Sequence, residues 1–162
     1  MNAGFINMDG YELRKAFNEP YCLIFRKAVY RFALHDPMPI MFRRANGELI
    51  QPDRRFFSDM GSIPISLQWA IPKDTYLEPY LFHDSAYLHH GLWFRGVDDL
   101  CFSFRALTVW ESNALLKEMM LAQGAWSITA NAVYGAVQAC GWAIWANAER
   151  RHMAGSQNEG EE

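Results

Sequence analysis

The chain has 162 residues, of which 51% are hydrophobic and 15% aromatic, so it contains ample apolar material for the core of one domain. Its formal net charge of −3 excludes the overall basic field that holds nucleic acid, and we expect no nucleic-acid partner. Cys22, Cys101 and Cys140 are widely spaced without a CxxC pair, which indicates buried apolar side chains in a reducing compartment rather than a disulfide framework.

The first third of the chain has the composition of β-strands. Residues 21–35, YCLIFRKAVYRFALH, mix aromatic and β-branched side chains with interleaved charges. Asn46 and Gly47 lie between two extended runs and predict a two-residue hairpin turn in which both residues have positive φ. Pro52 is expected to end the second strand of that hairpin.

Two helices are predicted beyond the strands, where the hydrophobic period changes from two toward about 3.6 residues. Pro79 suits the first turn of a helix through residues 79–90. A second helix should begin after Thr108, because Thr108 and Glu111 form a capping-box pattern. That helix should end at Gly124, a residue that readily takes the left-handed conformation after a helix.

A third helix is predicted over residues 128–151, and most of it lies in the uncharged stretch 125–148. The polar residues Asn131 and Gln138 lie seven apart on one helical face, which favours a central helix of a soluble domain over a membrane span. The fold class is therefore α+β, with N-terminal antiparallel strands and a hairpin followed by three packed helices. We expect one globular domain over residues 1–152 and a disordered acidic tail over residues 153–162.

The stretch YLFHDSAYLHHGLW, residues 80–93, carries the chemically most informative side chains. In a helix, His83, Tyr87 and His90 share a face, and Asp84 lies about 100° around the axis from His83. This pattern suits metal-assisted ester hydrolysis, in which His83 is the general base and Asp84 holds a hard divalent cation. The apolar residues 91–94 that follow would suit a lip that contacts an apolar interface.

Two other interpretations of the same side chains stay open. The His-Asp-Tyr set could be a hydrogen-bonded network inside the core, since buried polar groups are usually paired. A zinc site formed by His83, His89 and His90 is weaker, because adjacent histidines on a helix diverge and no second ligand cluster is evident. The sequence therefore does not decide whether the protein is an enzyme.

A second candidate cation site lies in FFSDMGSIP, residues 56–64. Asp59 and Gly61, followed by Ser62, could form a turn whose oxygen atoms meet a cation. Asp and Ser side chains in turns also simply bond the local backbone, and that alternative stays open.

Taken together, these motifs resemble a family of tailed phages and prophages that is catalogued as domain of unknown function 1353. The family has a hairpin that ends in proline, an Asp-x-x-Ser-Ile/Val-Pro element, a tryptophan, His-Asp-x-x-Tyr, and a helix with spaced Leu and Met before a glycine. The counterparts here span roughly residues 40–145: Pro52, SDMGSIP at 58–64, Trp69, HDSAY at 83–87, and NALLKEMMLAQG at 113–124. The resemblance implies a phage protein with other phage proteins as partners, located in the host cytoplasm or the virion.

Asn113 departs from this family pattern, because the family usually has aspartate at that position. An asparagine can orient a histidine, but it cannot stabilise an imidazolium ion by charge. The departure favours a non-catalytic role.

There is a looser likeness to calcium-dependent secreted phospholipases of the A-two type and to their parvovirus capsid relatives, which also carry His-Asp-x-x-Tyr on a helix. It implies His83 as general base and Tyr87 and Asn113 as supporting residues. It further implies a phospholipid surface as partner and Ca²⁺ as cofactor, held by Asp84 and by the loop around Asp59 and Gly61. The disulfide framework and the Gly-rich calcium loop of the secreted enzymes are absent from the sequence.

The sequence thus predicts a phage-encoded accessory or virion-associated protein whose His-Asp-Tyr set is buried and non-catalytic. The alternative is a calcium-assisted ester hydrolase of phospholipase type. A second alternative is a small membrane-associated phage lysis or exclusion protein that uses residues 125–148.

Overall fold

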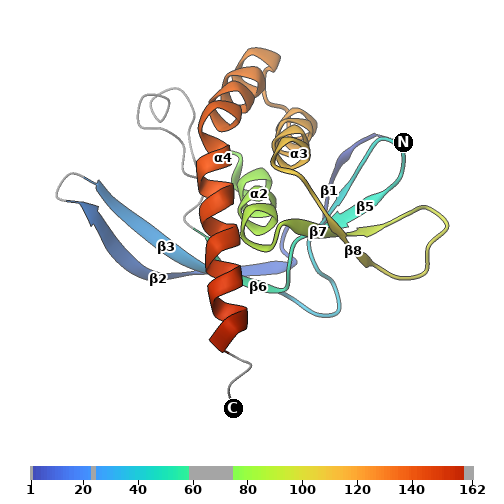
Figure 1. Cartoon of the computed structure of the whole chain (residues 1–162). Helices are drawn as coiled ribbons and strands as arrows, with labels where there is room; N and C mark the ends of the chain where they lie inside the picture. The colour runs from blue at the N-terminus through green and yellow to red at the C-terminus, as the bar shows by residue number, and fades with distance from the viewer. Residues whose placement is uncertain (1, 23–24, 59–74, 159–162) are drawn as a thin grey trace.

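The computed structural model describes residues 2–22, 25–58 and 75–158 of the chain. Within them the chain has the predicted α+β fold, with antiparallel strands in two sheets and three packed helices (Figure 1). Two strands that the sequence did not predict lie between the first and second of these helices.

Every strand pair is antiparallel, in a five-stranded sheet of order β1-β4-β5-β7-β8 and a three-stranded sheet of order β2-β3-β6. The long β2–β3 hairpin extends away from the helices on one side, and the five-stranded sheet lies on the other (Figure 1). The strands are β1 Gly4–Ile6, β2 Tyr11–Cys22, β3 Phe25–Leu34, β4 Met41–Arg43, β5 Leu49–Gln51, β6 Arg55–Ser58, β7 Gly91–Arg95 and β8 Ser103–Ala106.

The predicted hairpin connects β4 and β5, but its turn differs from the expected type. The Gly47 amide donates to the Arg44 carbonyl at 2.9 Å, and the Arg44 amide donates to the Glu48 carbonyl at 2.8 Å. Gly47 has a φ of 90°, whereas Asn46 is not among the described residues with positive φ. The prediction that both turn residues have positive φ was therefore wrong, since the turn is longer and places only the glycine in the left-handed region. Pro52 directly follows β5, as predicted.

Helix α3, Val109–Ala122, has the predicted ends. The Glu111 amide donates to Thr108 Oγ1 at 3.2 Å, and the Thr108 amide donates to Glu111 Oε2 at 2.7 Å. Gly124 has a φ of 91°, and its amide and that of Ala125 donate to the carbonyls of Leu121 and Met120. This double closure satisfies carbonyl groups that the helix leaves free at its C-terminus.

Replacing Thr108 with alanine should lower the free energy of unfolding by about 1 kcal/mol at neutral pH, because a helix cap is lost.

Hydrogen bonds from the Thr108 amide, and then from its hydroxyl, lower the pKa of Glu111. The stabilisation by Glu111 is thus present above the ordinary carboxyl pKa and is lost as the pH falls through the lowered value. Urea unfolding of the wild type and of Glu111→Ala across this range should show the difference between them closing in acid. A difference that stays constant with pH would contradict this role of the carboxylate.

Helices α2, Leu77–His89, and α4, Ser127–Asn158, complete the fold. Pro79 lies in the first turn of α2, as predicted, and α4 continues past Arg151, where the sequence predicted its end. No helix of the described residues is long and apolar enough to cross a membrane.

Helix α2 separates two hydrophobic clusters. Leu81, Phe82 and Ala86 pack into the larger cluster with the strands and part of α3, and Tyr80 packs into a smaller one with α3 and α4. Both of these faces of α2 are thus covered, and the polar side chains of Glu78, His83 and Ser85 are buried among neighbouring elements.

Two expectations about surface and burial were wrong. Residues 91–94 form part of β7 inside the five-stranded sheet, where Leu92 and Phe94 are only 1% and 4% exposed and Trp93 is 36% exposed, so they do not form a continuous apolar lip. Cys101 and Cys140 are exposed free cysteines rather than buried ones, and the side chain of Cys22 lies outside the described part of the structure. A short apolar run does not reveal which neighbouring residues will cover it, and the number of cysteines does not reveal whether they are buried.

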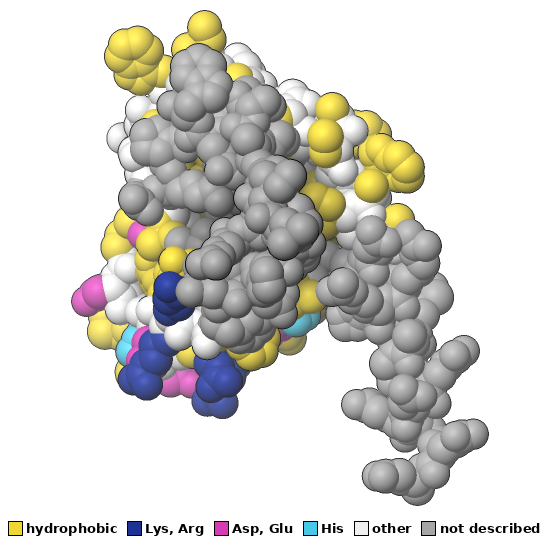
Figure 2. Space-filling view, turned by 90° about the vertical axis from the view of Figure 1, so that its left-hand side faces the viewer, with side chains coloured by type: hydrophobic (Ala, Val, Ile, Leu, Met, Phe, Trp, Pro, Cys, Tyr) yellow, Lys and Arg dark blue, Asp and Glu magenta, His cyan; other side chains and the backbone are white. Residues whose placement is uncertain are grey.

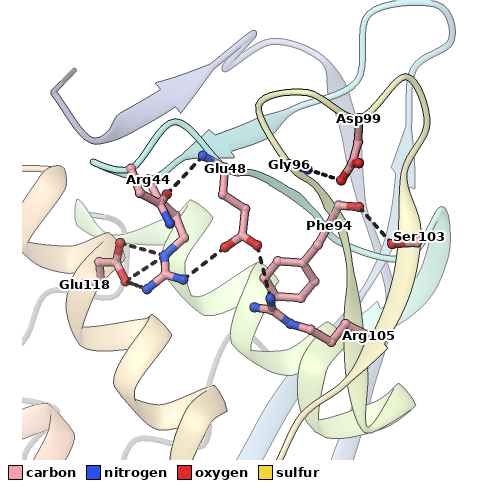
Figure 3. Close-up of polar contacts among 9 residues, drawn as sticks. Arg44, Glu48, Phe94, Gly96, Asp99, Ser103, Arg105 and Glu118 are labelled. Carbon is pink, nitrogen blue, oxygen red and sulfur yellow. Dashed lines mark hydrogen bonds and ion pairs between the residues drawn. The ribbon is translucent and has the colours of Figure 1, made fainter.

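An ion-pair network joins α3 to the β4–β5 hairpin and to β8 (Figure 3). Arg44 Nη2 lies 2.8 Å from Glu118 Oε2, and Arg44 Nη1 lies 3.0 Å from Glu48 Oε2. Arg105 Nη1 lies 3.1 Å from the other oxygen of Glu48, and its guanidinium covers the Phe94 ring. Hydrogen bonds to Glu118 raise the pKa of Arg44 against the opposing effect of burial. This network links α3 to the β4–β5 hairpin and the hairpin to β8.

Large apolar side chains are exposed around the start of α4 and along its length. Trp126, Ile128 and Trp142 are 79%, 75% and 64% exposed. Figure 2 shows hydrophobic side chains at the top and upper right of the molecule, whereas charged ones gather at the lower left. Residues 119–148 contain no charged side chain, so this part of the surface is neutral as well as apolar.

Candidate functional site

Three of the predicted site residues meet between α2 and α3. His83 and Tyr87 lie one turn apart on α2, with ring centroids 4.2 Å apart. Asn113 of α3 is fully buried, and its Oδ1 lies 2.9 Å from His83 Nε2. The same oxygen accepts a hydrogen bond from the Tyr87 hydroxyl at 2.7 Å. The helical spacing of His83 and Tyr87 and the position of Asn113 on the next helix thus produce one polar cluster.

Helix α4 also contacts this cluster, through residues that pack against Asn113 and Tyr87. Asn113 Nδ2 donates to Gln138 Oε1 at 3.3 Å. A Cβ atom added at Gly141 would overlap the Tyr87 hydroxyl and would lie 3.2 Å from Tyr87 Cζ. The Trp145 ring meets that of Tyr87 edge-on, with centroids 5.1 Å apart. A side chain at position 141 would therefore occupy the space in which the Tyr87 hydroxyl reaches Asn113.

Sequence reasoning did not assign these α4 residues to the site. Gln138 was visible as a polar residue in an apolar helix, and a glycine in such a helix is compatible with close packing. Their partners on α2 and α3 depend on how the helices pair, which no local pattern encodes.

The hydrogen bond to Asn113 defines which ring nitrogen of His83 donates. Asn113 Oδ1 is an acceptor, so His83 Nε2 carries the proton and the lone pair of the neutral imidazole lies on Nδ1. Burial raises the pKa of Tyr87 to about 12, against the hydrogen bond to Asn113, which lowers it. Tyr87 is therefore a neutral donor at physiological pH, and Asn113 orients the imidazole without adding a charge.

Asp84 lies beside this cluster and bonds to the end of β6. Its Oδ2 accepts a hydrogen bond from the Ser58 hydroxyl at 2.5 Å, and Ser58 is 1% exposed. The other predicted cation ligands, Asp59 and Gly61, lie outside the described residues. Within the described residues no group of three or more His, Cys, Asp or Glu side chains could hold a metal ion.

The remaining histidines of the stretch pack against aromatic rings. His90 follows α2 with a left-handed φ of 54°, so it does not continue the helical face of His83 and Tyr87 as predicted. Its ring packs edge-on against Trp145, with centroids 4.4 Å apart. The His89 ring lies 6.3 Å from the Phe56 ring, centroid to centroid. The described residues therefore offer no support for the zinc alternative.

Comparison of this chain with protein-family models, with curated proteins and with solved structures finds no match.

Proposed function

We propose that the cluster on α2 and α3 is a general-base site for the hydrolysis of an ester, and that His83 is the base. The observation that supports it best is the orientation of the imidazole. Asn113 Oδ1 accepts the Nε2–H of His83 at 2.9 Å, so the basic nitrogen of the neutral imidazole is Nδ1.

In this proposal His83 Nδ1 takes a proton from a water molecule as the water oxygen attacks the ester carbonyl carbon. The electron pair of the carbonyl moves onto its oxygen to give a tetrahedral intermediate. As that pair re-forms the carbonyl, the bond from carbon to the alkoxy oxygen breaks, and the imidazolium gives its proton to the leaving alkoxide, so that a carboxylic acid and an alcohol result. Asn113 and Tyr87 hold the ring in one orientation throughout. Because Asn113 is neutral, it gives the imidazolium less stabilisation than a carboxylate would, and we expect slow turnover.

Calcium remains a prediction for this site. Ca²⁺ prefers six to eight oxygen ligands, and Asp84 alone does not supply them. We therefore derive no step through a metal, and the chelator comparison described below tests whether one is needed.

The second candidate is the function that the sequence favoured, a non-catalytic phage accessory or virion role. It is supported by the hydrogen bonding of Asn113, which is 0% exposed and bonds three partners on two other helices. Such a network can simply fix the packing of α2, α3 and α4. The resemblance to phage proteins applies to either function.

The two functions are separated by hydrolysis of a short-chain phosphatidylcholine, measured with calcium and with a chelator. We expect wild-type turnover that falls by at least about a hundredfold in His83→Gln. Glutamine can still donate from its amide to Asn113, but it has no basic ring nitrogen, so a loss of activity does not require a loss of fold. His35→Ala is the control, since His35 is exposed. Absence of wild-type turnover in either condition would favour the non-catalytic role.

A further inference from the structure

Tyr80 carries a polar atom that the rest of the fold leaves unused. Its side chain is 1% exposed, and its hydroxyl has no hydrogen-bond partner among the described residues. Burying a hydroxyl group without a partner is unfavourable, so native structures rarely retain one unless another molecule meets it.

The surroundings of the Tyr80 ring define what such a molecule must be made of. The ring belongs to a hydrophobic cluster whose other buried members lie in α3, in α4 and in the connection between them. These are Leu116, Met120, Ala125, Ala130 and Val133. A ligand that reaches the hydroxyl must therefore place an apolar portion against this cluster.

The negative charge of Asp84, next to Tyr80, restricts which polar group the ligand can carry. Asp84 lies one helical turn after Tyr80 on the same face of α2. Burial first, and then electrostatic interactions with Tyr76 and Asp84, raise the pKa of Tyr80, so its hydroxyl remains a neutral donor. A carboxylate ligand would be repelled by Asp84, whereas a neutral carbonyl oxygen would accept the hydrogen bond.

We infer that the Tyr80 hydroxyl binds the neutral carbonyl oxygen of an acyl ligand whose hydrocarbon chain packs among α2, α3 and α4. The assignment of this ligand as the substrate rests on the proposed ester hydrolysis, because Tyr80 is one turn from His83 and Asp84 on α2. The binding site itself depends only on the buried hydroxyl and its apolar surroundings.

Octanamide is a suitable probe, because it has a neutral carbonyl and an alkyl chain and is not an ester. We expect calorimetry to show octanamide binding to the wild type and about tenfold weaker binding to Tyr80→Phe, as for one lost hydrogen bond. Octanoate, which is charged, should bind more weakly than octanamide to the wild type. Equal binding of octanamide to both proteins, or no binding to the wild type, would overturn the inference.

Thermal unfolding without a probe provides the second measurement. Tyr80→Phe should have an unchanged or higher Tm, because no hydrogen bond is lost. Tyr87→Phe is the matched control and should have a lower Tm, since it loses the bond to Asn113. A fall in Tm for Tyr80→Phe as large as for Tyr87→Phe would overturn the inference, because the hydroxyl would then already be bonded within the protein.

These outcomes are distinct from those that test the proposed function. Octanamide binding that depends on Tyr80, without any ester turnover, would support this site and contradict the hydrolase. Ester turnover that is unaffected in Tyr80→Phe would support the hydrolase and contradict the role of Tyr80.

Discussion

Replacing Asn113 with alanine should lower the free energy of unfolding by about 2–4 kcal/mol, because it leaves several buried polar groups without a hydrogen-bond partner. The His83 Nε2 proton and the Tyr87 hydroxyl both lose their acceptor, and Gln138 loses its donor. Asn113 is 0% exposed, so water cannot replace these bonds without opening the contact between the helices. Denaturant unfolding at neutral pH would measure the loss.

The matched control is Asn131→Ala on α4, because Asn131 is exposed and bonds only its neighbour Ser127 among the described residues. We expect that substitution to change the unfolding free energy by less than about 0.5 kcal/mol. If Asn113→Ala costs no more than Asn131→Ala, the network does not stabilise the fold.

Asn113→Asp separates the structural role of this position from a catalytic one. Aspartate retains an oxygen that can accept from His83 and Tyr87, and it adds a charge that stabilises an imidazolium ion. Under the proposed hydrolysis the variant should turn over faster than the wild type. In a non-catalytic protein the substitution would change stability alone.

Local signals predicted those parts of the fold that short-range contacts decide. The capping box at Thr108 and Glu111 and the closure at Gly124 involve residues within one helical turn, and both are present. Asn46 and Gly47 marked the hairpin, but the pairing of β4 with β5 selected a longer turn than the dipeptide alone favours. Residues 91–94 were too short an apolar run to reveal a strand, since their partners lie in β5 and β8.

In the candidate site, too, helical spacing predicted some contacts, whereas others depend on how the helices pack. Helical periodicity alone places His83 beside Tyr87, and their rings lie 4.2 Å apart. The role of Asn113 followed from a family resemblance, not from spacing, because it depends on how α2 packs against α3. Gly141 belongs to the site through the pairing of α4 with both helices, which sequence periodicity cannot specify.

Replacing Gly141 with alanine should destabilise the protein by about 1–3 kcal/mol, although alanine is the better helix former by about 1 kcal/mol. The new Cβ would overlap the Tyr87 hydroxyl, and it would lie 3.2 Å from Tyr87 Cζ and 3.6 Å from Asn113 Nδ2. The Tyr87 ring is packed against His83 on one side and Trp145 on another, with centroid distances of 4.2 Å and 5.1 Å. Because these contacts leave Tyr87 little room to yield, we expect the hydrogen bond to Asn113 to be lost. Denaturant unfolding of the wild type and the variant would measure the change.

Gly135→Ala provides a control on the same helix with the opposite expected sign. A Cβ at Gly135 would meet nothing within 4 Å, so alanine there should stabilise the protein by about 0.5–1 kcal/mol through its helix propensity alone. The clash can be isolated by combining Gly141→Ala with Tyr87→Phe, which removes the oxygen that the new Cβ overlaps. The double variant should then be more stable than the sum of the two single losses predicts, by at least about 0.5 kcal/mol. Strict additivity, or stabilisation by Gly141→Ala equal to that by Gly135→Ala, would mean that α4 does not hold Tyr87 against Asn113.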